Sequence, residues 1–136
     1  MSDRAESFIV LARRDLDLAK LVSAKDPGNA AFHLQQAAEK LAKAVLDIEG
    51  IPSGVIHQIG ALAALLPADH VLRPDLAAFD RFSSFATSTR YPMPGGGLPR
   101  LPPKNFLAEG IKEVASLLDD IDDYRRERRT AARRRR

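Results

Sequence analysis

Apolar residues recur at helical spacing along most of the chain, most clearly in residues 31–48. Steps of three and four residues separate Leu34, Ala38, Leu41, Val45 and Ile48. This spacing places the five side chains on one stripe of a helix with 3.6 residues per turn. The segment therefore predicts a helix that packs in a core and stops at about Glu49, before Gly50 and Pro52.

A row of polar residues runs beside this apolar stripe. It consists of His33, Gln36, Lys40, Lys43 and Asp47. Donors and ionisable groups next to a core seam suit a surface that binds a ligand or a partner. The alternative is a solvated helix flank held by ion pairs four residues apart, such as Glu39 with Lys43.

Four further segments have helical spacing. They cover residues 5–24, 55–66, 72–86 and 105–124. Ser2 or Asp3 can cap the first of them, and Asp26 or Asn29 can cap the helix that follows. The phenylalanines of the third segment, and its last residues Phe85 and Ala86, are expected to pack in the core.

Residues 87–104 break the helical pattern. Proline and glycine are frequent here, and the stretch opens with Arg90-Tyr91-Pro92, so it predicts one long loop. Loops of this length in a small domain tend to be functional or mobile. The triplet Gly95–Gly97 is not a phosphate-binding loop, because it follows no strand and no Lys-Ser or Lys-Thr ends it.

These segments predict the fold class. Five helical segments without a credible strand favour an all-α protein, an up-and-down four-helix bundle in which residues 55–66 form one short accessory helix. The bundle is expected to span residues 1–124 as a single domain. Apolar residues on the first helix outside its main stripe, such as Leu11, Leu18 and Val22, exceed what one bundle needs and predict a homodimer.

Charge is unevenly distributed. Residues 1–124 carry 13 Lys and Arg against 17 Asp and Glu, a net charge of −4, whereas residues 125–136 carry eight Arg against Glu127, a net charge of +7. We expect this basic segment to prolong the last helix by about a turn and then to be largely disordered. It suits contact with the phosphates of RNA or another polyanion, or it serves only to increase solubility.

Composition excludes several classes of chemistry. The chain has no cysteine, which excludes thiolate catalysis and cysteine zinc sites, and no motif predicts a metal or a cofactor. No apolar run reaches the ~20 residues of a membrane span, and the first residues do not form a secretory signal. We therefore expect a cytoplasmic protein without membrane contact.

Two motifs in order resemble the HEPN family, named for higher eukaryotes and prokaryotes nucleotide binding. They are the run Phe-His-Leu-Gln-Gln-Ala-Ala-Glu-Lys-Leu-Ala-Lys-Ala of residues 32–44 and the triplet Arg90-Tyr91-Pro92, with His57 between them. The resemblance covers residues 4 to about 125. It implies an all-helical bundle that pairs as a homodimer, is often encoded beside a minimal nucleotidyltransferase, and acts in toxin–antitoxin or other defence systems.

The resemblance also raises the question of ribonuclease activity. In active members an Arg is followed by four to six residues and then a His. The histidines here are His33, His57 and His70, none of which stands at that distance after an arginine. Since metal-independent RNA cleavage needs a general base and a general acid, we lean toward a module that is not an enzyme.

The predicted function is therefore binding of a nucleotide or RNA. The ligand-binding candidates are Arg90, Tyr91, Lys40, Lys43, Gln36 and Glu39. One alternative is a ribonuclease toxin in which His57 or His33 replaces the usual histidine. The other is a purely structural dimerisation domain in which Arg90 anchors the loop by bonding backbone carbonyls or a carboxylate such as Glu39.

Overall fold

The computed structural model describes residues 3–86 and 88–135, without the side chains of Phe85, Ala86 and Ser88. The helices are α1 (Arg4–Val22), α2 (Pro27–Ile48), α3 (Ile59–Ala64), α4 (Arg73–Ala78), α5 (Ser83–Ala86) and α6 (Lys104–Arg134), with two 3₁₀ helices, η1 (Phe79–Phe82) and η2 (Ser88–Arg90). No described residue lies in a strand. The predicted all-α class is confirmed.

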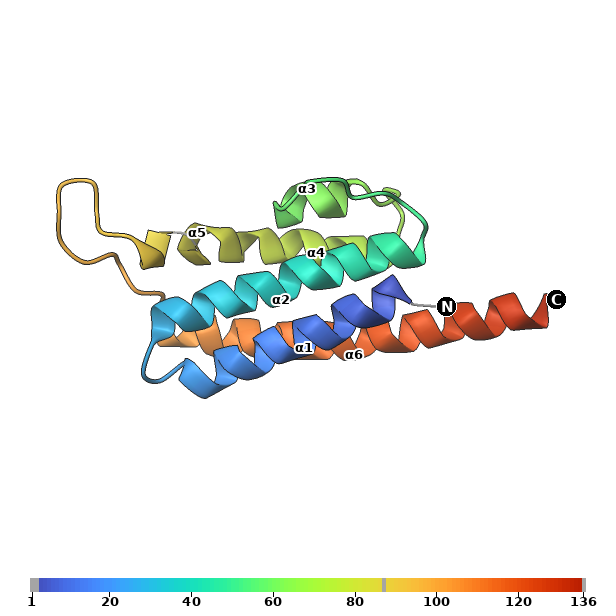
Figure 1. The fold of residues 1–136 in the computed structure, drawn as a ribbon, viewed down its shortest axis with the longest axis horizontal. Helices are drawn as coiled ribbons and strands as arrows, with labels where there is room; N and C mark the ends of the chain where they lie inside the picture. The colour runs from blue at the N-terminus through green and yellow to red at the C-terminus, as the bar shows by residue number, and fades with distance from the viewer. Residues whose placement is uncertain (1–2, 87, 136) are drawn as a thin grey trace.

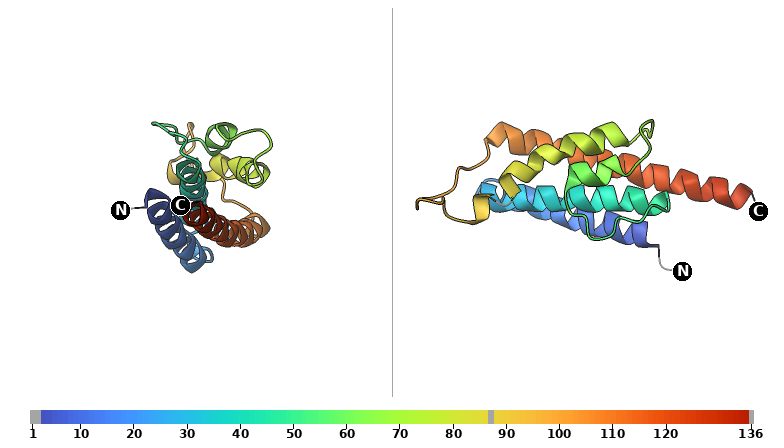
Figure 2. Two further views of the ribbon diagram at one scale, coloured as in Figure 1. Left: turned by 90° about the vertical axis from the view of Figure 1, so that its right-hand side faces the viewer. Right: turned by 90° about the horizontal axis from the view of Figure 1, so that it is seen from above.

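The helices form a bundle around α2. Helices α1 and α6 pack along one side of α2, while α4, η1 and α5 follow one another in a row along its other side (Figure 1). Helix α3 lies against α2 and α4 as the short accessory helix. Seen from above, α6 runs past the rest of the bundle (Figure 2).

Carboxylates cap the first two helices as the sequence predicts. Asp3 accepts a hydrogen bond from the backbone N–H of Glu6 at 3.1 Å, and Asp26 accepts one from the N–H of Asn29 at 3.2 Å. Each satisfies an amide that the first helical turn leaves without a partner. These caps fix the starts of α1 and α2 and hence the reversal of the chain between them.

The core is centred on the apolar stripe of α2. Leu34, Leu41 and Val45 are fully buried. Helix α6 approaches closely at Gly110, where an added Cβ would lie 2.7 Å from Leu34 Cδ2 and 2.8 Å from Phe82 Cε1. Only a residue without a side chain allows α6 to contact both α2 and η1 at this point.

Two of the predicted helices are shorter in the structure than the segments of apolar spacing that predict them. The segment expected to be one helix over residues 72–86 is divided into α4, η1 and α5, and Ser84 Oγ donates to the carbonyl of Arg81 at 3.0 Å. Serine side chains that bond nearby carbonyls compete with regular helical turns. The prediction that Phe85 and Ala86 pack in the core concerns side chains outside the described part.

The helix expected over residues 55–66 is reduced to α3. Gly54, with a φ of +58°, adopts a left-handed conformation just before this segment, and residues 55–58 remain non-helical. A left-handed residue ends regular helical geometry. Apolar spacing alone therefore overestimated the length of this element.

The basic segment differs most from its prediction. It was expected to be largely disordered, but α6 continues through it to Arg134. Its first residue, Arg125, is buried and pairs with Asp3 at 3.1 Å, and alanine and arginine are both strong helix formers. Separately, the described helices include none that is long and apolar enough to cross a membrane.

Candidate functional site

An open cleft of about 710 Å³ lies between α2 and the chain that follows α5. Its lining comes from α2, from the stretch before α3, from the first residue of α5 and from residues at the end of η2: Phe32, Gln35, Gln36, Glu39, His57, Gln58, Ser83, Arg90 and Tyr91. The volume falls in the range of small-molecule binding sites. The cleft also brings together both motifs that the sequence singles out.

Arg90 lies on one wall of the cleft without a counter-charge. Its guanidinium carbon lies 4.1 Å from the centre of the Phe32 ring, a cation–π contact. No described carboxylate forms an ion pair with it, so the ion pair with Glu39 that the structural alternative invoked is absent from the described residues. The side chain is exposed and leaves donors free to bind an anion.

Packing of η2 against the start of α2 fixes the position of Arg90. The hydroxyl of Thr89 donates to the carbonyl of Gly28 at 3.3 Å. An added Cβ at Gly28 would lie 3.2 Å from Thr89 Cβ, tighter than ordinary van der Waals contact. The glycine in the first turn of α2 therefore allows the segment with Arg90 to lie close to Phe32.

Glu39 organises the opposite wall. It is 7% exposed, and its carboxylate contacts His57 Nδ1 at 3.1 Å, Lys43 Nζ at 3.3 Å and Gln35 Nε2 at 3.3 Å. This many partners can compensate the cost of a buried carboxylate. Lys43 is thus a structural partner of Glu39, which is the ion pair predicted for a helix flank.

His57 presents an imidazole to the cleft. Its side chain is 72% exposed. Its Nδ1 lies 3.1 Å from the Glu39 carboxylate and 3.4 Å from Lys43 Nζ, so these contacts orient the ring; in the tautomer that carries its hydrogen on Nδ1, Nε2 is an acceptor. It does not cap α3, whose N-cap residue is Gln58.

The predicted polar row of α2 is divided between two faces. Gln36 lines the cleft. His33 Nδ1 instead lies 3.0 Å from Asp15 Oδ1 on α1, and Lys40 pairs with the same carboxylate. Asp47 pairs with Arg4 at 3.2 Å. His33, Lys40 and Asp47 therefore join α1 to α2 and are not part of the cleft lining.

Four lining residues were not predicted: Phe32, Gln35, Gln58 and Ser83. A signal for two of them was present, because Phe32, Gln35 and Glu39 are separated by steps of three and four residues and share one face of α2. Gln58 and Ser83 come from other segments, and no local pattern pointed to them. Within the described ranges, no three His, Asp or Glu side chains converge so as to hold a metal ion.

Comparison with known proteins identifies the class. The family model of the HEPN domain matches residues 5–122, and the chain belongs to this family. No curated protein matches it.

Two solved structures share the fold. The crystal structure of TT1696 from Thermus thermophilus is 26% identical and superposes with a TM-score of 0.69, covering 90% of this chain and 98% of that one. The structure of ST0689, an archaeal HEPN homologue, is 25% identical with a TM-score of 0.66, covering 91% and 99%. The predicted family is thus confirmed.

Proposed function

We propose that this HEPN domain binds a nucleotide or RNA in the cleft between α2 and η2. The observation that carries the proposal is Arg90, a guanidinium held against Phe32 on the cleft wall, in no ion pair with a described residue. A planar guanidinium can bind a phosphate through two parallel hydrogen bonds.

The rest of the cleft suits the other parts of a nucleotide. Tyr91 is 63% exposed at the rim, and exposed aromatic rings stack on bases with about 1–3 kcal/mol per base. The amides of Gln35 and Gln36 each donate one hydrogen bond and accept one within the chain. Each therefore keeps one N–H and one oxygen lone pair for the edge of a base. Glu39 holds His57 in position beside them.

Removing Arg90 tests the proposal. Arg90→Ala should weaken binding of adenosine triphosphate and of a short RNA at least tenfold, as expected for loss of a charge-assisted hydrogen bond. The matched control is Arg81→Ala, since Arg81 also stacks on a phenylalanine, Phe82, at 4.5 Å but lies outside the cleft lining. It should leave affinity within about twofold.

Isothermal titration calorimetry with thermal unfolding in parallel separates binding from folding. We expect the melting temperature of Arg90→Ala to stay within about 2 °C of that of the intact protein, because the side chain is exposed. A large loss of thermal stability with ligand affinity intact would instead support the purely structural interpretation of Arg90.

A second candidate function is RNA cleavage that uses His57. The supporting observation is that His57, unlike His33, lines the same cleft as Arg90 and is oriented by Glu39 at 3.1 Å. As a general base it would take the proton of a ribose 2′-hydroxyl, whose oxygen then attacks phosphorus while the bond to O5′ breaks and the leaving O5′ takes a proton from water. Cleavage of RNA that survives His57→Ala would exclude this candidate.

We further propose that the domain is a homodimer, with the exposed face of α1 as the interface. Val10, Arg14, Asp17 and Leu21 are all exposed and follow one another at steps of four, three and four residues. Two antiparallel copies of α1 would bring Val10 to Leu21 and Arg14 to Asp17 in both directions. Such a surface is complementary to itself.

Charge exchange tests the dimer. Light scattering at micromolar concentration should give twice the monomer mass for the intact chain and the monomer mass for Arg14→Asp, which places like charges together. The double variant Arg14→Asp/Asp17→Arg should restore the dimer, because the pairing is reversed but preserved. A monomer mass for the intact chain would exclude the proposal.

The cellular role follows the family resemblance. We infer a toxin–antitoxin or other defence system in which a minimal nucleotidyltransferase is the partner. Co-purification of this domain with the product of an adjacent nucleotidyltransferase gene tests this role, and the absence of such a neighbour would argue against it.

A further inference from the structure

Helix α6 carries the basic segment as a continuous helix beyond the bundle. It has 31 residues and α2 has 22, so at 1.5 Å per residue α6 is longer by about 14 Å. Its last turns project past the first residues of α1 (Figures 1 and 2). The arginines therefore have defined positions relative to the bundle.

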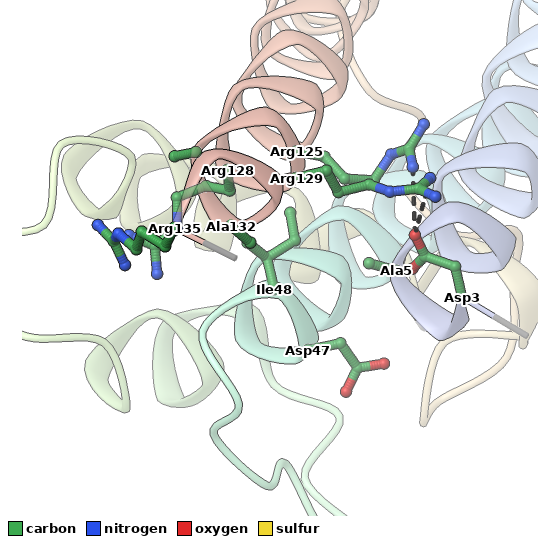
Figure 3. A pocket seen from close by; sticks show the side chains of 10 residues that line it. Asp3, Ala5, Asp47, Ile48, Arg125, Arg128, Arg129, Ala132 and Arg135 are labelled. Carbon is green, nitrogen blue, oxygen red and sulfur yellow. Dashed lines mark hydrogen bonds and ion pairs between the residues drawn. The ribbon is translucent and has the colours of Figure 1, made fainter. Parts of the chain in front are cut away.

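Three of these arginines are already bound to carboxylates of the bundle. Arg125 pairs with Asp3 at 3.1 Å and Arg129 with the same carboxylate at 3.7 Å, while Arg128 pairs with Glu49 at 3.1 Å. Figure 3 shows Asp3 facing the two guanidinium groups of Arg125 and Arg129 beside the start of α1. We call these three ion pairs the α6 anchor.

The following arginines are different. Arg133, Arg134 and Arg135 are exposed and form no ion pair with a described residue. The only acid in residues 125–136 is Glu127, two turns earlier in the helix. Their charge is therefore available to an external anion, whereas the charge of the anchor is largely neutralised within the chain.

The composition of this helix end excludes two common partners. Between Arg129 and Arg133 the side chains are Thr130, Ala131 and Ala132, with no large apolar residue. A helix that docks in a protein groove needs apolar anchors at steps of three and four residues, and one that lies on a membrane needs a broad apolar face. Several guanidinium groups without such anchors suit a chain of phosphates.

We propose that Arg133, Arg134 and Arg135 form a second contact for nucleic acid, which binds the phosphodiester backbone without reading its bases. The proposal rests on the proposed function for the expectation that nucleic acid is the ligand, but the contact lies outside the cleft. Arg125, Arg128 and Arg129 hold the helix in place and contribute little to binding. Of the arginines of the basic segment that the structure describes, these three then contribute most to the dependence of binding on salt.

The salt dependence of binding tests this division. Each phosphate neutralised on a single strand adds about −0.7 to the slope of log K against log salt. The variant Arg133→Gln/Arg134→Gln/Arg135→Gln should therefore reduce the magnitude of the slope by about 2. The probes are fluorescent 20-nucleotide homopolymers of uridine and of thymidine. Their binding to the full-length protein and to the full-length variant is measured by fluorescence anisotropy.

A matched variant controls for overall charge. Lys25→Gln/Lys104→Gln/Lys112→Gln also removes three exposed cations that form no ion pair with a described residue. Its slope should stay within about 0.5 of that of the intact protein, because these residues lie apart from the helix end. Equal reductions in the two triple variants would overturn the proposal, since general attraction would then explain the binding.

The remaining outcomes identify the ligand. If the triple arginine variant has a reduced slope with both homopolymers, the proposal is supported and the helix end binds the phosphates that RNA and DNA share. If the slope is reduced with only one of them, the proposal is supported and the ligand is that kind of nucleic acid. Failure of both homopolymers to bind, with tight binding of a 20-residue polyglutamate peptide, overturns it in favour of an acidic protein surface.

Failure of the cleft is distinguishable from failure of this contact. The Arg90→Ala variant should lose affinity for adenosine triphosphate but keep the full salt slope with the homopolymers, whereas the triple arginine variant should do the reverse. If the triple variant keeps the slope of the intact protein, the helix end does not contact nucleic acid, whatever the cleft binds.

Discussion

The cleft and the α6 anchor contain the same kinds of side chain in opposite situations. In the cleft, Arg90 is exposed and stacks on Phe32 without a carboxylate partner among the described residues. At the anchor, Arg125 is 7% exposed and contacts Asp3 and Asp122 at 3.1 and 3.3 Å. An arginine held by buried ion pairs contributes to folding, and one whose donors face solvent is available for binding.

The histidines repeat this contrast. His57 and His70 each place one ring nitrogen 3.1 Å from a glutamate, Glu39 and Glu49 respectively. The side chain of His57 is 72% exposed, whereas that of His70 is 6% exposed and its Nδ1 accepts a hydrogen bond from the N–H of Leu72. Contact with a carboxylate therefore does not by itself mark a functional histidine, and exposure separates the two.

The largest expected effect is on the stability conferred by the anchor. Arg125→Met keeps the aliphatic part of the side chain. Among the described residues it leaves Asp3 with only the ion pair to Arg129, at 3.7 Å, and Asp122 with only that to Arg126, at 3.1 Å. Breaking a fully buried pair costs ~3–5 kcal/mol, and because these carboxylates remain 27% and 19% exposed, we expect a loss of ~2–3 kcal/mol in the free energy of unfolding. Urea denaturation at one protein concentration measures it.

Arg90→Met is the matched control for this change. It makes the same replacement, arginine by methionine, at an exposed position and should change the free energy of unfolding by less than ~0.5 kcal/mol. The comparison fails if the two substitutions cost the same, or if the cleft variant is the less stable protein.

A smaller effect is expected from the histidines. His70→Ala removes the acceptor of the Leu72 N–H and a partner of Glu49, and should lower the free energy of unfolding by ~1–2 kcal/mol. His57→Ala, in the exposed position, should lower it by less than ~0.5 kcal/mol. Thermal unfolding of both variants checks the order, and a more damaging change at His57 would assign that residue a structural role.

Much of the fold could be predicted from the sequence because local signals and burial agree along the long helices. The stripe of Leu34 and Leu41, the cap at Asp26 and the end of α2 all follow from spacing and turn residues. The interrupted helix from Arg73 to Ala86 was missed because its apolar spacing continues through the 3₁₀ turn η1. Periodicity reports which face is buried and cannot detect a change of helix type.

The site could be predicted only in part. The two motifs located Arg90, Tyr91, Gln36 and Glu39, all of which line the cleft. Lys40 lies outside the cleft lining and pairs with Asp15 on another helix, because helical spacing carries no information about which neighbour covers a flank. The anchor was missed for the same reason, since the residues Asp3 and Arg125 are 122 positions apart.

The two tyrosines of the chain provide the smallest and last contrast. Tyr124 Oη donates to Glu49 Oε2 at 3.2 Å beside the anchor, whereas Tyr91 is 63% exposed in the cleft. Burial, followed by the charge of Glu49 and the hydrogen bond to it, raises the pKa of Tyr124 above its ordinary value of 10.0. The folded state therefore retains this proton to a higher pH than the unfolded state does.

The higher pKa of Tyr124 in the folded state than in the unfolded state contributes stability. This contribution is complete below the ordinary pKa and is lost as pH rises through the raised pKa of the folded state. Tyr124→Phe should therefore make the fall in the free energy of unfolding between about pH 10 and pH 12 shallower, with urea midpoints at each pH as the measurement. Tyr91→Phe removes the exposed phenol and should reproduce the profile of the intact protein. Identical profiles for Tyr124→Phe and the intact protein would show that the Tyr124–Glu49 contact does not couple this proton to folding.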